Sequence, residues 1–165
     1  MEPIIRAHLP TSAQHIVLRK SALDYMAKYI QNRLWKLEAG GQLFGHLKDG
    51  TLEIKVATGP YLGDLRKRFG YRSKPDCAQR EIEKQRERGL YYCGDWHTHP
   101  QAHPTASTED LSTISKMVQR SDFRLSCMVM VIQGTDDGAK GVAVYTSSGD
   151  APKRWEVVDD WVRIV

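Results

Sequence analysis

The pattern of apolar and charged residues predicts three helices. Leu23, Met26, Ala27, Ile30 and Leu34 lie at i, i+3, i+4, i+7 and i+11, which is one face of an α-helix. A short strand over 15–20 leads into that helix. A second, charged helix is predicted over 76–88, and a third over 107–120. The third has an inward face formed by Leu111, Ile114, Met117 and Val118.

Strand patterns fill much of the remaining chain. Two predicted strands, 42–48 and 51–58, flank Asp49-Gly50, a favoured two-residue hairpin turn. The run 126–133 is apolar throughout, as expected for a strand buried on both faces. Further strands are predicted over 90–96, 141–146 and 154–158. The pattern predicts an α/β fold with a mixed central β-sheet flanked by helices, and a long surface loop over 59–74.

Composition narrows the class of protein. A chain of 165 residues with 41% hydrophobic and 27% charged residues suits one compact domain, so we expect a single domain over 1–165. The sequence has no apolar run long enough for a signal peptide or a membrane span. The three cysteines are an odd number without paired spacing. These features favour a cytoplasmic protein without disulfides or membrane contact.

Charge adds one candidate surface. The formal net charge is +4, and basic residues crowd into the segment 64–74. Such a segment can attract nucleic acid or an acidic protein face, or it can be a solvated loop. The sequence has no Pro-Cys-x-x-Cys motif of the base deaminases. A nucleic-acid partner is therefore not favoured, and we predict that this basic segment instead helps to hold a protein substrate.

The segment from Gly94 to Pro100 carries the clearest chemical signal. Residues two apart at the end of a strand point to the same side, so His97 and His99 can project together as two imidazole ligands. Pro100 cannot continue a central strand, so the chain turns away there. Zinc favours nitrogen ligands of this kind and commonly takes a carboxylate as the third ligand.

Asp110 is the candidate for that carboxylate. It lies four residues before Ile114, beside the inward face of its helix, where an unpaired carboxylate would be costly to bury. Two histidines and one carboxylate leave a fourth position for water, as in a catalytic zinc site. Each motif alone has a common alternative explanation, because His-x-His occurs by chance and Ser107-x-x-Asp110 is also a helix cap.

Taken together, these residues resemble the motif of the JAMM metalloproteases, also called the MPN+ or JAB family. The matching positions are His97-Thr98-His99-Pro100, then Ser107-x-x-Asp110, with Glu38 upstream in a segment ending at Gly45. The resemblance covers about residues 15–150 and implies a JAB/MPN, cytidine-deaminase-like domain. It implies one zinc ion per chain held by His97, His99 and Asp110. Spacing alone could not have joined Glu38 to these residues.

Within the family, the segment 94–100 and the preceding basic helix are most similar to small bacterial JAB proteins of CBASS antiphage operons. The resemblance implies an isopeptidase that removes a conjugated nucleotide cyclase from its target. The substrate would be a protein with an extended C-terminal tail, joined to its target by an E1-E2-like enzyme and cut after its C-terminal residue.

The resemblance also assigns roles to two residues. Glu38 would take a proton from the water on the zinc and return it to the leaving amine. The Ser107 hydroxyl would donate a hydrogen bond to the developing oxyanion. Asp95 shares strand parity with His97 and could orient an imidazole or make a structural hydrogen bond. His103 could approach the metal, but its proline-bounded loop favours exposure.

Two alternatives remain open at this stage. A non-catalytic MPN scaffold would bind partners without stoichiometric metal. A related hydrolase could process a sulfur-carrier protein or a small amide. The sequence does not indicate which C-terminal tail is cut, whether ubiquitin itself is a substrate, or the oligomeric state.

Overall fold

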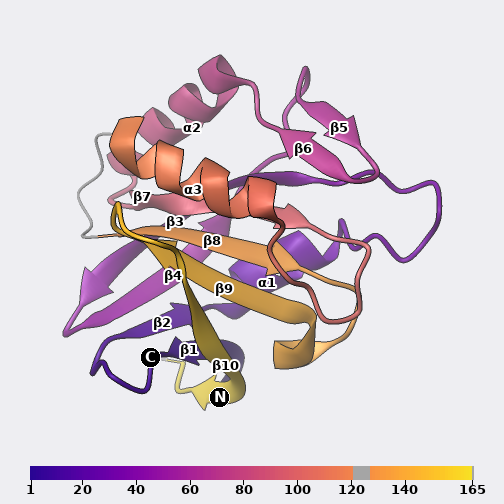
Figure 1. The fold of residues 1–165 in the computed structure, drawn as a ribbon. Coiled ribbons are helices and arrows are strands. Elements are labelled where there is room, and N and C mark those ends of the chain that lie inside the picture. Colours follow the sequence, from indigo (N-terminus) through magenta and orange to yellow (C-terminus); the bar gives the residue numbers. More distant parts are fainter. Residues whose placement is uncertain (121–126, 165) are drawn as a thin grey trace.

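The computed structural model describes residues 1–120 and 127–164 (Figure 1). In chain order the elements are β1 (Glu2–His8), β2 (His15–Leu18), α1 (Lys20–Ala27), β3 (Gly40–Lys48), β4 (Thr51–Ala57), β5 (Leu65–Lys67), β6 (Gly70–Arg72), α2 (Pro75–Glu87), β7 (Tyr91–Thr98), α3 (Thr108–Arg120), β8 (Met128–Gln133), the 3-10 turn η1 (Gly138–Gly141), β9 (Val142–Ser147) and β10 (Lys153–Val162). Ser126, at the start of one predicted strand, lies outside the described residues.

Eight of the strands form a closed barrel in the order β1-β10-β9-β8-β7-β3-β4-β2. The pairs β2–β4 and β7–β8 are parallel, and the others are antiparallel. The prediction of a mixed central sheet flanked by helices is therefore wrong. Strand directions are mixed, but the sheet closes on itself and few helices cover it (Figure 1).

Closure depends on a strand that the hydrophobic pattern did not indicate. β1 pairs with β2 on one side, and its whole length pairs with residues 156–162 of β10 on the other. Proline usually argues against a strand because it cannot donate to the ladder, and Pro3 lies within β1, opposite Trp161. β10 also continues to Val162, four residues beyond the predicted end. Without these two segments the sheet would have stayed open.

β8 shows how the barrel and its outer layer share one strand. Val129 and Val131 belong to the core inside the barrel, together with Trp96 of β7. Met130 and Ile132 point the other way and pack with Ile114 of α3. The strand is buried on both faces, as its apolar sequence predicted.

No helix in the described part of the chain is long and apolar enough to cross a membrane.

The first helix is shorter than its apolar periodicity indicates. α1 ends at Ala27, and residues 28–39 have no regular secondary structure. Leu34, the last member of the predicted stripe, is 82% exposed. The backbone of this segment is instead held by side chains from elsewhere in the molecule. Tertiary hydrogen bonds have therefore overridden the local pattern.

The two hairpins had different outcomes. β3 and β4 are joined by Asp49 and Gly50, both with positive φ, which confirms the predicted turn. The segment 59–74, predicted as a loop, contains the β5–β6 hairpin. This hairpin lies beside the irregular segment before β3, where the Glu38 N–H donates to the Lys67 carbonyl (Figure 1).

Candidate metal centre

Strand parity separates the side chains at the end of β7. His97 is paired in register with Ile132 of β8, so it lies on the outer face of the barrel wall, which α3 covers. Trp96 and Thr98 point inward, and both are 0% exposed. His99 follows directly after the strand and returns to the outer side. The predicted projection of both imidazoles to one side is confirmed, with ring centroids 4.8 Å apart.

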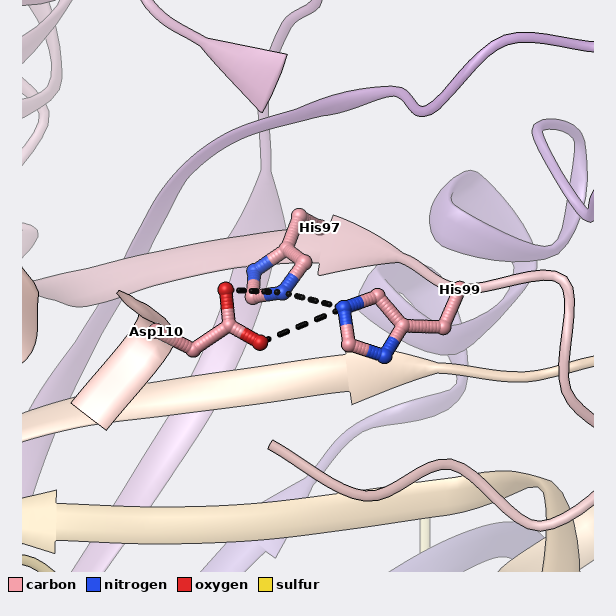
Figure 2. Close-up of side chains that lie close together, drawn as sticks. All are labelled: His97, His99 and Asp110. Carbon is pink, nitrogen blue, oxygen red and sulfur yellow. Dashed lines mark hydrogen bonds and ion pairs between the residues drawn. The ribbon is translucent and has the colours of Figure 1, made fainter. Parts of the chain in front are cut away.

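His97, His99 and Asp110 converge on one point (Figure 2). Asp110 Oδ1 lies 3.2 Å from His97 Nε2, Asp110 Oδ2 lies 3.2 Å from His99 Nε2, and the two Nε2 atoms are 3.1 Å apart. Two atoms bound tetrahedrally to one zinc at about 2.0–2.1 Å would lie roughly 3.3 Å apart. The donor set and its spacing therefore fit a zinc-sized ion. Among the described residues, this is the group suited to hold a metal.

The start of α3 fixes the carboxylate. The Asp110 N–H donates to Ser107 Oγ (3.1 Å), and the Ser107 N–H donates to Asp110 Oδ2 (2.8 Å). This reciprocal pair satisfies two donors at the helix N-terminus, as in a capping box. The helix-cap interpretation of Ser107 therefore holds, and the same bonds aim Asp110 at the two imidazoles. Capping and ligand placement use the same two residues.

Burial and charge act against each other at this cluster. Burial alone would raise the pKa of Asp110, but hydrogen bonds from His97 and His99 hold it well below its usual range. Burial opposes protonation of His99, yet the Asp110 carboxylate raises the pKa of His99 overall. A carboxylate must be ionised to bind a cation, and Asp110 stays ionised beside the two imidazoles.

Glu38 lies at the edge of this cluster although it is about sixty residues away in the sequence. Its Oε1 is 3.9 Å from His99 Nε2, and the residue is only 5% exposed. Burial raises the pKa of Glu38 to about 7, with Asp110 adding to the rise and His99 opposing it. The carboxyl is therefore poised between its two protonation states near neutral pH.

One contact orients His99 beyond the cluster itself. Its Nδ1 lies 3.2 Å from the side-chain oxygen of Gln101, which also accepts the N–H of Thr105 (3.1 Å). Because an amide oxygen only accepts, Nδ1 carries a proton, and a metal ion would take the lone pair of Nε2. Gln101 was missed in the sequence, where its place two residues after His99 was the available signal.

The other candidates lie elsewhere. Asp95 accepts a hydrogen bond from Tyr92 (2.6 Å), and burial raises its pKa to about 6. This favours the structural alternative over orientation of an imidazole. His103 is exposed and pairs with Asp136 at 2.9 Å. It lies outside the metal-ligating group.

A buried chain of polar groups behind the site was also missed. The Thr98 hydroxyl donates to the side-chain oxygen of Gln31 (2.9 Å) and accepts the N–H of Ala39 (3.0 Å). The Thr98 N–H donates in turn to the Ala39 carbonyl (2.8 Å). These bonds tie the residue between the two histidines to the residue after Glu38. No local sequence pattern pairs such distant residues.

Comparison with known sequences identifies relatives that share one name. The chain is similar to three curated proteins called CD-NTase/cGAS isopeptidase. It is 28% identical to the one from Escherichia coli over 74% of this chain and 78% of that protein. It is 30% identical to the Pseudomonas aeruginosa protein over 68% of this chain and 73% of that protein. The Enterobacter hormaechei relative is 38% identical, but the match spans only 38% of its length.

A solved structure supports the fold. The chain superposes on the solution structure of protein DSY2949 from Desulfitobacterium hafniense with a TM-score of 0.61. The match covers 83% of this chain and 87% of that one at 15% identity. The sequence profile described as "Prokaryotic homologs of the JAB domain" matches residues 20–156. The resemblance predicted from the sequence is thereby confirmed, and the chain belongs to the family of prokaryotic JAB-domain homologues.

Proposed function

We propose that this protein is a zinc-dependent isopeptidase. Its substrate would be a CD-NTase-type cyclase whose C-terminus has been joined to another protein by an E1-E2-like enzyme. The observation that carries the proposal is the approach of the buried Glu38 carboxylate to a His97–His99–Asp110 cluster that fits a metal ion. A metal ligand set and an adjacent acid/base are the two parts that hydrolysis of an amide needs.

The metal ligands come from two regular elements. His97 lies in β7, His99 follows directly after that strand, and Asp110 lies in the first turn of α3. When bound, zinc would polarise the scissile carbonyl and lower the pKa of a coordinated water toward about 7. Gln101 would keep the Nε2 lone pair of His99 directed at the ion.

Glu38 would move the proton. Its buried carboxyl, with a pKa raised to about 7, can accept a proton from the attacking water and return it to the leaving lysine amine. Matching of the pKa to the working pH makes both transfers accessible to one group. Such general acid/base catalysis accelerates a reaction by about 10²- to 10⁴-fold.

Ser107 would stabilise the transition state. Its oxygen accepts the Asp110 N–H, which leaves the hydroxyl hydrogen free to donate to the developing oxyanion. Loss of one such donor typically costs about 2.7–4 kcal/mol. The same side chain would therefore serve as helix cap and oxyanion donor.

Cleavage of defined fusions tests the substrate assignment. A bacterial CD-NTase would be joined through its C-terminal residue to a lysine of a carrier protein, and the products identified by intact mass. We expect release of the cyclase with its native C-terminus and an unmodified carrier lysine. A chain that binds zinc and cleaves a small amide or a sulfur-carrier fusion instead would contradict the substrate. A chain without zinc or cleavage would be a scaffold.

A further inference from the structure

The β5–β6 hairpin holds the backbone of Glu38 from both sides. The Glu38 N–H donates to the carbonyl of Lys67 at 2.7 Å. Arg66 Nε donates to the Glu38 carbonyl at 2.9 Å. Both polar backbone groups of Glu38 are thus satisfied by a hairpin that begins 27 residues later in the chain. The carboxylate can point at the metal cluster only while this backbone stays in place.

Arg68 fastens the segment that leads to Glu38. One of its guanidinium nitrogens, Nη1, lies 3.0 Å from the carbonyl of Arg33, 2.9 Å from that of Leu34 and 3.3 Å from that of Lys36. Residues 28–39 have no regular secondary structure, so these carbonyls have no helix or strand partner. The charged guanidinium supplies hydrogen bonds in place of those that a helix or strand would give these carbonyls.

Gln31 links this arrangement to the strand that carries the histidines. Its side chain is buried at 3% exposure and donates to the carbonyls of Lys36 (3.2 Å) and Arg68 (3.0 Å). Its oxygen accepts the Thr98 hydroxyl at 2.9 Å. Thr98 lies between His97 and His99, so hairpin, irregular segment and metal-binding strand form one connected hydrogen-bond network.

The hairpin is itself anchored. Tyr71 donates its hydroxyl to Asp64 at 2.5 Å, and the other oxygen of Asp64 accepts the N–H of Lys74 at 2.7 Å. The ring of Tyr71 lies so close to Gly40 that a Cβ at this position would come within 2.6 Å of it. Glycine is required there because the hairpin packs directly against the first residue of β3.

The basic segment therefore contains two kinds of side chain. Arg66 and Arg68 bond to backbone carbonyls around Glu38. Lys67 and Arg72 are exposed. Among the described residues, neither of these two side chains makes a hydrogen bond or an ion pair. Substrate capture, the role expected from charge alone, is available to the exposed pair. The hydrogen bonds of Arg66 and Arg68 to backbone carbonyls point to a different task.

We propose that Arg66 and Arg68 are positioning residues that set the location of the Glu38 carboxylate relative to the metal cluster. This inference rests on the proposed function of Glu38. The two arginines act through the Glu38 backbone and do not need to touch substrate. Because a displacement of about 1 Å can cost roughly 100-fold in rate, their loss should lower kcat while leaving the metal ligands in place.

Amide hydrogen exchange and kinetics on the same proteins test the proposal. Wild type would be compared with Arg68→Met, Arg66→Met and the milder Arg68→Lys. Arg72→Met removes the same charge from the same hairpin and is the matched control for exchange. The readouts are exchange at the Glu38 amide with and without zinc, zinc content, melting temperature, and kcat and KM on the cyclase fusion.

We expect Arg68→Met to speed exchange at the Glu38 amide by roughly tenfold or more and to lower kcat by roughly 10- to 100-fold. Zinc content and KM should remain at the wild-type values. Arg68→Lys should recover part of both effects, since an ammonium can still donate to one or two of the carbonyls. Exchange in Arg72→Met should match the wild type.

Three results would overturn the proposal. One is unchanged exchange at the Glu38 amide in both Arg66→Met and Arg68→Met. Another is a rise in KM with kcat unchanged in these variants. The third is an equal effect of Arg72→Met on exchange. If Arg68→Met does not fold, Arg66→Met and Arg68→Lys decide in its place. If wild type cleaves no fusion, the proposed function fails, and exchange at Glu38 still decides whether the arginines hold it.

Discussion

The two halves of the candidate site are built in opposite ways. His97 and Asp110 lie in a strand and in the first turn of a helix, each with a regular backbone around it. Glu38 lies in an irregular segment whose backbone is held by side chains of a distant hairpin. The metal cluster therefore depends on local geometry, and the acid/base depends on long-range hydrogen bonds. We expect the two halves to fail separately when they are disturbed.

The largest effect is expected from removal of the metal carboxylate. Asp110→Asn keeps an oxygen that can accept the Ser107 N–H, so α3 should still begin normally. The lost charge should lower zinc affinity by more than about 100-fold, since even indirect partners of a ligand contribute 10- to 100-fold. Zinc affinity by competition with a chromophoric chelator measures this loss.

The matched control is Glu109→Gln, an exposed acid in the same helical turn. It removes an equal charge but no proposed ligand. Equal zinc affinity in Asp110→Asn and wild type would show that Asp110 does not bind the ion. A loss of affinity in Glu109→Gln as large as in Asp110→Asn would point to net charge as the cause.

A smaller loss is expected when the oxyanion donor is removed. Ser107→Ala should lower kcat by about 10²- to 10³-fold and destabilise the protein by about 1 kcal/mol through the lost cap. Zinc should remain bound. Steady-state kinetics and denaturant unfolding measure the two losses.

Ser107→Asp separates the cap from the catalytic role. Aspartate caps a helix about as well as serine, but an ionised carboxylate cannot donate a hydrogen bond. Turnover should therefore stay low while stability recovers. Wild-type turnover in Ser107→Asp would mean that the residue acts as a cap alone.

Thr98→Val tests the link between the two halves. It keeps the shape of the side chain but removes the bonds to Gln31 and Ala39. The unpaired buried groups should cost about 1–3 kcal/mol in the free energy of unfolding. We expect zinc content to survive and turnover to fall, because only Glu38 loses its support. Thr98→Ser should restore both stability and turnover. A loss of zinc larger than the loss of turnover would contradict the separation of the two halves.

The smallest effect is expected at His103. Its exposed pair with Asp136 should contribute at most about 1 kcal/mol to the free energy of unfolding, and it lies outside the cluster. His103→Ala should therefore change stability little and leave zinc binding unaltered. Isothermal titration with zinc would show this, and a weakened affinity would add His103 to the ligand sphere.

The same contrast explains what the sequence could predict. The shared side of His97 and His99 follows from strand parity, and the hairpin at Asp49-Gly50 follows from turn chemistry. Barrel closure was missed because Pro3 masks β1, and it needs pairing between the two ends of the chain. Gln31 and Arg68 were missed since their bonds join segments far apart in sequence. The proximity of Glu38 to His99 came from family resemblance, and its catalytic role stays a prediction.

The most direct measurement is zinc content and turnover of Glu38→Gln on one preparation, with the cyclase fusion as substrate. Glutamine fills the same space but cannot accept the proton. We expect zinc to remain at the wild-type stoichiometry while kcat falls by about 10²- to 10⁴-fold. Wild-type turnover in Glu38→Gln, or loss of zinc together with activity, would contradict the division between a metal-holding half and a proton-moving half.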